Sequence, residues 1–571
     1  MTSHAPSYAD GPDAIRRIAS MSNAAHKFDV AVVGGGPVGL VAANLLASRG
    51  RSVVLFERNA TTSNAAKAIS LDDESLRILQ SAGLAADVLN IVVPGTGTAY
   101  YSRRGRVLFR ATTAEPYRLG FPFKSSFSQP ELEAVLLRAL TARATAEVHF
   151  STAVVDLAQD RDSVRVRAAG PDDNLVDYRA QWVLGCDGGR STVRRLLNIT
   201  MGGRSFDEPW LVVDTTADPH DEQYGMHHGD PRRPHVIVPG RDGRCRYEFL
   251  LRSTEAKAGE KPAHELMQNL LASYRTLNAD DVERAVVYTF HALVAERWQD
   301  QRCLLLGDAA HMMPPFAGQG LNSGLRDAGN LCWKISDVLD GRIAPSAIAT
   351  FESERRPHAE ATVTLSARLG SIVMTTSPIK AAVRDALVRI ALCTPWGRRY
   401  LTEMRYRPRL RVVAGLISSD HPAGSRKHRG LLGTTISQPR VYEVSRRAVQ
   451  LLDDVLGPGW SLIGVDLDDG DWVRLAEHGL PRYLAARLID ASVAGHLRRP
   501  ASNRTVVVDV DTGLHKLLRG LDGKWLLLRP DRVIAAIGSP DDLSALSELS
   551  ERLLAGQHEG VALSAGAVVP N

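Results

Sequence analysis

One stretch near the amino terminus constrains the fold more than any other. Residues 28–58 read FDVAVVGGGPVGLVAANLLASRGRSVVLFER. An apolar run at 30–33 stops at three glycines, an Ala/Leu-rich helical pattern follows, and a second apolar run at 53–56 ends at Glu57. This order predicts a strand, a helix and a second strand, because short β-branched runs favour strands and the longer Ala/Leu pattern favours a helix. The stretch is therefore expected to form a βαβ unit.

The glycines of this unit have the spacing of a dinucleotide site. Gly34, Gly36 and Gly39 match G-x-G-x-x-G, in which the first glycine permits a tight turn, the second lets a pyrophosphate approach and the third lets the helix pack on the strands. The helix amino terminus would offer free N–H groups to phosphates. Glu57 stands where a carboxylate accepts hydrogen bonds from a ribose. The alternative is a glycine-rich packing turn.

Size and charge limit the classes of protein that remain. With 571 residues the chain is too long for one core, so two or three domains are expected. Its 44% hydrophobic and 23% charged content is ordinary for a globular protein. The net charge of +5 is spread along the chain without a dense basic run. No nucleic-acid partner is therefore expected.

Cysteine usage and hydropathy indicate the compartment. The five cysteines are an odd number, widely scattered, with no C-x-x-C pair and no Cys/His cluster at metal spacing. They predict a reducing compartment, no metal and no redox disulfide. No apolar run approaches the roughly 18 residues that span a bilayer, and no signal-peptide core is present. A cytoplasmic location without a membrane contact is expected.

The chain divides by pattern into five parts. Residues 1–27 are polar and rich in small residues and are expected to be disordered, with Met21 as an alternative translation start. Residues 28–199 are expected to form the first part of the nucleotide domain, including a substrate-facing hairpin near 96–127. Alternating strand patterns at 200–299 predict an inserted antiparallel sheet that binds substrate. Residues 300–400 return to the nucleotide domain and its helices, and 401–571 form a linker and a small α/β domain.

Three separated motifs, GGGPVG at 34–39, CDGGRSTVR at 186–194 and GDAAHMMPPFAGQGLN at 307–322, carry a family resemblance. The chain resembles the FAD-dependent aromatic hydroxylases of the para-hydroxybenzoate and phenol hydroxylase group. FDEPWLVVD at 206–214 and YTFHALVAERW at 288–298 are similar to the 3-(3-hydroxyphenyl)propionate hydroxylase branch. The resemblance covers about residues 28–400. It implies a Rossmann-like FAD-binding domain with an inserted substrate sheet.

Larger members of this group often carry a thioredoxin-like carboxy-terminal domain. LLLRPDRVIAA at 526–536 is similar to its terminal strands. Because no C-x-x-C occurs there, packing or a contact in a homodimer is the expected role of this domain.

The resemblance also implies a set of FAD-binding residues. Asp308 would accept hydrogen bonds from the ribityl hydroxyls, Pro315 and the 318–322 backbone would line the flavin ring, and Gln129 would contact the ribityl or pyrophosphate region. Asp187 and Arg194 match a D-G motif linked to FAD and to the nicotinamide donor. The expected cofactor residues are Gly34, Gly36, Pro37, Val38, Gly39, Glu57, Arg58, Lys67, Gln129, Asp187, Arg194, Gly307, Asp308, Pro315, Gly318, Gly320, Leu321 and Asn322.

Each polar member of this set has a plainer alternative. Asp308 could be a helix cap, Gln129 a residue of a helix start, Asp187 a turn residue and Arg194 a surface residue. Lys67 stands where relatives often have arginine, and it could be a solvated lysine, since lysine cannot make the same forked contact.

The implied reaction is the hydroxylation of a phenolic ring. NADH or NADPH would reduce FAD, O₂ would add to give a flavin C4a-hydroperoxide, and an electron-rich ring would attack its distal oxygen. Since a phenolate is the more electron-rich form, a base with a pKa near neutral would help. The candidates are His291 and His228, with Tyr247 and Tyr101 as hydrogen-bond partners, against ordinary packing roles for all of them.

Three other functions are alternatives to hydroxylation. An FAD-dependent dehydrogenase or disulfide reductase is disfavoured, because Cys186 has no partner at C-x₄-C spacing and no second G-x-G-x-x-G is present. A halogenase is disfavoured because none of the eight tryptophans forms a W-x-W pair. A flavin-binding module without catalysis stays open.

Overall fold

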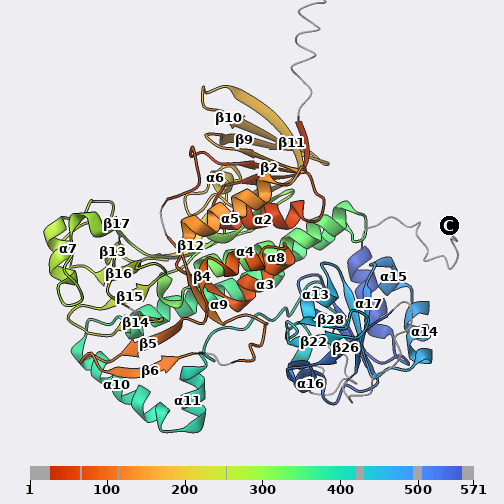
Figure 1. Cartoon of the computed structure of the whole chain (residues 1–571). Helices are drawn as coiled ribbons and strands as arrows, with labels where there is room; N and C mark the ends of the chain where they lie inside the picture. The colour runs from red at the N-terminus through yellow and green to blue at the C-terminus, as the bar shows by residue number, and fades with distance from the viewer. Residues whose placement is uncertain are drawn as a thin grey trace, which may run out of the picture.

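The computed structural model describes residues 26–64, 67–112, 115–220, 222–252, 254–419, 430–492 and 504–555. Most of the expected disordered extension, residues 1–25, lies outside this part. The last two residues of that extension do not fit the expectation, because β1 (His26–Val33) begins at His26 and pairs with β11 from there on. Figure 1 shows the nucleotide domain beside the sheet inserted into it, with the carboxy-terminal domain as a separate blue body.

A largely parallel sheet forms the nucleotide domain. Its path runs β19 (Gln299–Asp300), β20 (Cys303–Leu305), β11 (Leu175–Gly185), β1, β2 (Val53–Phe56) and β8 (Ala146–His149). The antiparallel strands β9 (Ala153–Gln159) and β10 (Val164–Ala169) join the first half of β11. The register pairs Val33 with Phe56 and with Gly185, and Gly185 with Leu305. Four neighbouring parallel strands therefore end at one level, where α/β sheets place their ligands.

Several helices pack against this sheet and complete the nucleotide domain. α2 (Pro37–Ala47) follows β1 and packs between α5 (Gln129–Thr141) and α8 (Gly320–Leu339). Its apolar residues are almost completely buried, as expected for a helix between two others and a sheet. α3 (Asp73–Ser81), α4 (Ala85–Leu89), α6 (Thr192–Leu196) and α9 (Thr350–Val373) complete the domain, and three-stranded sheets flank it. These are β3 (Ser70–Asp72), β7 (Lys124–Phe127) and β4 (Val92–Val93), and β12 (Met201–Ser205), β18 (His291–Ala295) and β21 (His311–Met312).

The second large sheet is the inserted one. Its order is β17 (Val282–Tyr288), β13 (Trp210–Thr215), β16 (Cys245–Leu250), β15 (His235–Pro239), β14 (Tyr224–His228), β5 (Gly97–Tyr101) and β6 (Val107–Ala111). One face packs against α7 (His264–Leu271) through a core that includes Leu211, Ile237 and Phe249.

Two details of this sheet differ from the expectation. The substrate-facing hairpin near 96–127, which was assigned to the nucleotide domain, supplies two strands of the inserted sheet. The sheet is also not wholly antiparallel, because β14 runs parallel to β5. Both strands can pair in this way because they belong to distant segments and need no tight turn between them.

The carboxy-terminal domain has its own seven-stranded sheet. Its order is β23 (Ala448–Leu451), β22 (Arg440–Glu443), β26 (Thr505–Asp509), β25 (Arg487–Ser492), β24 (Ser461–Val465), β27 (Lys524–Leu528) and β28 (Ile534–Gly538). Its helices are α13 (Leu452–Leu456), α14 (Asp469–Glu477), α15 (Leu480–Tyr483), α16 (Gly513–Leu518) and α17 (Ser544–Leu554). Buried ion pairs join it to the nucleotide domain: Arg529 Nη2 lies 2.7 Å from Glu354 Oε2, and Arg77 Nη2 lies 2.7 Å from Asp453 Oδ1. The thioredoxin-like classification stays a prediction.

Along the chain, α10 (Pro378–Leu392) and α11 (Pro395–Thr402) come between the nucleotide domain and the carboxy-terminal domain. Both helices pack on β6 of the inserted sheet. None of the helices in the described ranges has both the length and the apolar content that a bilayer crossing requires.

Candidate functional site

A cavity of about 430 Å³ lies where the ends of the parallel strands meet the inserted sheet. Its wall includes the turn after β1, the end of β2, the turn after β11, the loop after β20 and one face of β5, β14, β15 and β16. The cavity is thus continuous from the predicted nucleotide turn to the predicted substrate sheet. Of the expected cofactor residues, these line it: Gly34, Gly36, Pro37, Val38, Glu57, Arg58, Lys67, Gln129, Asp187, Asp308, Pro315, Gly318, Gly320 and Leu321.

The glycine turn has the geometry that its spacing predicts. Gly34 has φ +108°, a conformation that side chains rarely adopt. A Cβ on Gly39 would lie 2.0 Å from the Gly34 carbonyl oxygen, so only glycine lets α2 approach the turn. A Cβ on Gly36 would meet no atom within 4 Å, and no side chain caps this end of α2. The amino terminus of α2 is therefore open to the cavity.

Glu57 closes the turn from the end of β2. Its Oε2 accepts a hydrogen bond from the Gly35 N–H at 2.7 Å, and its Oε1 accepts one from the Asn59 N–H at 2.9 Å. The carboxylate is held beside the glycine turn and still lines the cavity.

The turn after β11 is built around Asp187. Its Oδ2 accepts hydrogen bonds from the N–H groups of Thr192 at 2.6 Å and Val193 at 3.1 Å. Arg194 does not line the cavity: its guanidinium donates to the carbonyls of Ala309 at 3.0 Å and Gly189 at 2.8 Å. Arg194 thus ties this turn to the loop after β20, and it acts on the site through the position of both.

Asp308 follows β20 and has its carboxylate in the cavity. Within the described ranges this carboxylate accepts no hydrogen bond. Enclosure in the cavity raises the pKa of Asp308, against the smaller opposite effect of His311 and Lys67. The preceding Gly307 lies outside the wall with φ +58°, and its N–H donates to Asp327 Oδ2 at 3.1 Å.

Asp327 was not anticipated from the sequence. It is fully buried on α8 and accepts from His311 Nε2 at 2.7 Å and from Arg355 Nε at 2.9 Å, as well as from Gly307. These bonds hold the loop after β20 against α8 and α9.

The loop before α8 presents backbone to the cavity. A 3-10 turn at Pro315–Ala317 ends at Gly318, with φ +61°, and α8 begins at Gly320. Asn322 lies behind this wall, where its amide donates to Gly318 O at 2.7 Å and Ser70 O at 3.1 Å. It positions the loop.

Gln129 and Lys67 meet at the side of the cavity. Gln129 Oε1 accepts from the N–H groups of Ala68 at 2.8 Å and Lys67 at 3.1 Å, and its Nε2 donates to Glu133 Oε1 at 2.8 Å. The carbonyl of Lys67 accepts from Arg246 Nη1 at 2.9 Å. Gln129 therefore anchors the loop after β2 and also lines the cavity.

None of the four expected catalytic side chains lies on the cavity wall. Tyr101 and His228 stack on each other on the far face of the inserted sheet, with ring centroids 4.3 Å apart. Tyr247 lies in the core of that face, and His291 bonds to Ser205 Oγ at 2.8 Å on the small sheet beside it. Successive residues of a strand point to opposite faces. The cavity is lined instead by the neighbours Tyr100, His227, Arg246 and Glu248.

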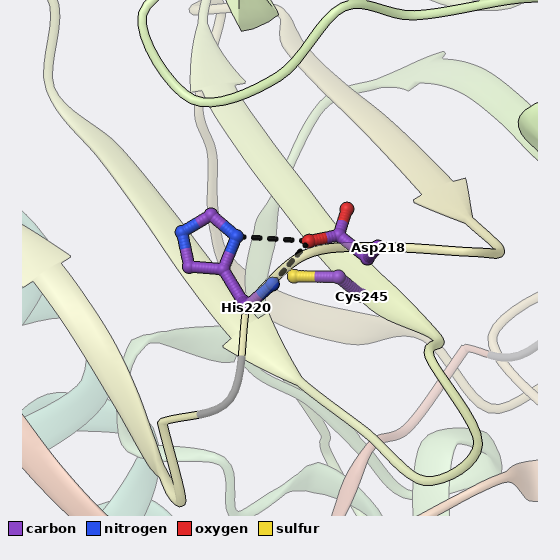
Figure 2. A group of neighbouring side chains, drawn as sticks. All are labelled: Asp218, His220 and Cys245. Atoms are coloured by element: carbon purple, nitrogen blue, oxygen red, sulfur yellow. Dashed lines mark hydrogen bonds and ion pairs between the residues drawn. The ribbon is translucent and has the colours of Figure 1, made fainter.

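Figure 2 shows Asp218, His220 and Cys245, whose possible ligand atoms all lie within 4.8 Å of one another. Asp218 accepts hydrogen bonds from the Tyr247 hydroxyl at 3.0 Å and from Arg275 Nη1 at 3.0 Å. Burial raises the pKa of Asp218, but the hydrogen bonds from its neighbours outweigh that effect and hold it below the usual range. Since Arg275 already neutralises the Asp218 carboxylate, we interpret Asp218, His220 and Cys245 as a structural cluster.

The wall formed by the inserted sheet carries aromatic and basic groups. The Tyr100 ring stacks on His227, with centroids 5.0 Å apart, and its hydroxyl lies 3.1 Å from that of Tyr406. Burial raises the pKa of Tyr100 and lowers that of His227 to about 3. Arg407 and Lys124 complete this end. Tyr406 and Arg407, in the stretch that was expected to be a linker, also line the cavity.

An FAD fits the residues present at the other end. The open amino terminus of α2 suits a pyrophosphate, Glu57 suits a ribose and the unpartnered Asp308 carboxylate suits hydroxyl donors. The backbone of the loop before α8 suits a planar ring.

Comparison with known families agrees with this fit. The family model described as an FAD binding domain matches residues 27–366, and the model of the HcaD C-terminal domain matches residues 433–553. A 3-(3-hydroxy-phenyl)propionate/3-hydroxycinnamic acid hydroxylase of Mycolicibacterium smegmatis is 36% identical, over 89% of this chain and 90% of its own length. The hydroxylase of the same name from Klebsiella pneumoniae is 33% identical, over 92% of this chain and 95% of its own length.

Solved structures share the fold over most of the chain. The flavin-dependent monooxygenase PieE, in complex with FAD and substrate, superposes with a TM-score of 0.76 at 20% identity and covers 92% of this chain and 99% of its own. Aklavinone-11 hydroxylase, in complex with FAD and aklavinone, has a TM-score of 0.72 at 23% identity and covers 93% and 99%. The predicted α/β class with a Rossmann-like FAD-binding domain is thus confirmed.

Proposed function

We propose that this chain, which belongs to the family of FAD-dependent aromatic hydroxylases, uses NADH or NADPH and O₂ to hydroxylate a phenolic ring bound against its inserted sheet. One observation carries the proposal: a single cavity joins the nucleotide turn to an aromatic and apolar wall. The relatives named as hydroxylases of 3-(3-hydroxy-phenyl)propionate support a phenol with a short side chain as the substrate class.

The nucleotide end would hold the cofactor. Gly36 and the amino terminus of α2 would receive the pyrophosphate, Glu57 a ribose, Asp308 the ribityl chain, and the loop at 315–321 the ring. Bound FAD supplies the redox chemistry, taking hydride from the nicotinamide and activating O₂. The amino terminus of α8 would favour negative charge on a ligand beside it.

The wall would hold the substrate and exclude water. Val236, Val238 and Phe316 give it an apolar surface, and the stacked rings of Tyr100 and His227 give it an aromatic one. An apolar enclosure suits this chemistry, because excluding water protects a reactive oxygen species from breakdown before it meets the ring.

Lys124 is a further candidate for the base, beside the four residues expected from the sequence. Burial and the nearby Arg407 lower the pKa of Lys124 to about 7. A lysine with that pKa can exchange a proton with a phenol at neutral pH. His227, with its pKa lowered to about 3, would act as a neutral hydrogen-bond partner.

The test is a panel of phenols with the purified protein. We expect a yellow protein that contains FAD, consumption of NADH or NADPH and of O₂ that rises when a phenol is added, and a product one oxygen atom heavier. NAD(P)H oxidation without ring oxygenation would indicate the alternative oxidoreductase, and no oxidation by an FAD-loaded protein would indicate the binding module.

A further inference from the structure

Two cations line the substrate end of the cavity without a counter-ion. Lys124, on β7, and Arg407, after α11, both belong to the wall. Within the described ranges, no carboxylate oxygen lies within 4.0 Å of either side chain. The third cation of this region, Arg246, differs, because its Nε lies 2.6 Å from Asp214 Oδ1.

The polar contacts of Lys124 are all neutral. Its ammonium lies 3.1 Å from Thr98 Oγ1 and 3.5 Å from the Gly97 carbonyl oxygen. A Cβ on Gly225 would lie 3.2 Å from the same nitrogen, which places it over the parallel pair β5 and β14. An ammonium held among dipoles at the edge of a cavity is costly unless an anion joins it.

Arg407 is held in a similar way. Its guanidinium lies over the Phe123 ring, 4.7 Å from the centroid, and donates to the Ala317 carbonyl at 3.4 Å. A guanidinium stacked on a ring keeps its edge free for a planar anion. The neighbouring Tyr406 reaches Tyr100 from the same segment.

The acids of the cavity are engaged elsewhere. Glu57 and Asp187 bond to backbone N–H groups of their own turns, and Glu133 accepts from Gln129 and from the Ser63 N–H. Glu248 faces Arg246 at 3.9 Å, and Asp308 lies near His311 and Lys67. Burial lowers the pKa of Lys124 and of His227, and each is lowered further by Arg407. The basic end therefore lacks the negative charge that would stabilise it.

We infer that Lys124 and Arg407 form an anion subsite that binds a negatively charged oxygen of the aromatic substrate. This inference rests on the proposed function for the identity of the ligand as an aromatic compound. The anion has two chemical sources, a carboxylate on the side chain of the substrate or the ionised phenol itself. Both present oxygens that an ammonium and a guanidinium recognise.

The experiment measures the affinity of the FAD-loaded protein for three probes by calorimetry. These are 3-phenylpropionate, 3-ethylphenol and neutral 3-phenylpropanamide. We expect Lys124→Met and Arg407→Met each to weaken an anionic probe about ten- to hundredfold, as for loss of a charged hydrogen bond, and the amide less than twofold. Weakening of 3-phenylpropionate identifies the carboxylate as the anion, and weakening of 3-ethylphenol identifies the phenolate.

Two matched variants control for loss of structure. Lys124→Arg retains the charge and should bind the anionic probe within about fivefold of the unaltered protein. Lys380→Met removes an exposed cation of α10 and should change nothing. If Lys124→Met does not fold, Arg407→Met and the comparison of propionate with amide in the unaltered protein still decide the matter.

Equal losses for all three probes, or no loss for any, would overturn the anion subsite. Failure of the proposed function has a different signature. A protein that prefers the anionic probe but never oxygenates a ring keeps the subsite and loses the function. A protein that hydroxylates neutral and anionic aromatics equally well keeps the function and loses the subsite.

Discussion

The nucleotide end and the substrate end of the cavity are formed by different kinds of structure. The nucleotide end gathers short turns that each follow a strand, and their positions agree with the spacing of the glycines and with Glu57, Asp187 and Asp308. The substrate end is one face of a sheet whose strands come from residues 97–101 and 224–250. A turn is a local property of a sequence, whereas a face depends on which way each strand is rotated.

That difference explains a systematic error of one residue. The sequence predicted Tyr101, His228 and Tyr247 at the site, while the cavity is lined by Tyr100, His227 and Arg246. Each selected residue is adjacent to one on the wall. Because side chains alternate along a strand, a correct strand with the wrong face misplaces every residue by one.

The largest effect is expected for a substitution that disrupts the nucleotide end of the cavity. Gly39→Ala places a Cβ 2.0 Å from the Gly34 carbonyl oxygen, so α2 must move away from β1 and the protein should be purified without FAD and with a lowered melting temperature. Gly36→Ala is the matched variant. Its Cβ meets no protein atom within 4 Å, so the apoprotein should melt normally and fail only to retain FAD. Normal FAD content in Gly36→Ala would contradict the assigned pyrophosphate position.

The next largest effect is expected at Asp327, which holds the loop after β20 behind the nucleotide end. Asp327→Ala leaves Arg355 buried and unpaired and releases Gly307, so we expect a loss of about 3–5 kcal/mol in the free energy of unfolding. Denaturant unfolding measures it. The control, Asp87→Ala at an exposed position of α4, should stay within about 0.5 kcal/mol. A loss as small as that of the control would remove Asp327 as the support of the loop.

A pair of equal substitutions tests the two faces of β5. Tyr100→Phe removes a hydroxyl that bonds to Tyr406 on the cavity wall, and we expect kcat/KM for a phenol to fall about five- to twentyfold, as for loss of one hydrogen bond. Tyr101→Phe removes a hydroxyl on the other face and should leave kcat/KM within about twofold. A reversed order would restore the original assignment.

A smaller effect should appear against pH. With a pKa of about 7, Lys124 is protonated below that pH and neutral above it. The affinity for an anionic probe should therefore be highest below pH 7 and fall, by at most about tenfold per pH unit, as pH rises further. Calorimetry of 3-phenylpropionate across this range measures it. Lys124→Met should abolish this dependence, and a dependence that survives in that variant would assign it to another group.

The smallest effect is expected for His291. Its ring bonds to Ser205 on the small sheet and lies off the cavity wall, so His291→Asn should leave the pH profile of substrate-dependent NAD(P)H oxidation unchanged. A shifted profile would return His291 to the mechanism.

The limits of prediction have physical causes. The glycines and Glu57 could be placed because spacing along the chain sets their geometry, whereas Asp187 and Asp308 were placed through the family resemblance. Asp327, Arg407 and Tyr406 could not, because their roles arise from contacts across distant segments, such as the bond between Tyr100 and Tyr406. Lys124 did carry a signal, as a single cation within the apolar stretch FPFKSSF.

The contact between the Tyr100 and Tyr406 hydroxyls joins two segments that are 306 residues apart in the chain. A ribosome that has released the chain through α8 has delivered each assigned FAD ligand. The substrate end of the cavity lacks part of its wall until residues 406–407 emerge. The residues assigned to FAD therefore all emerge before the substrate end of the cavity can be completed.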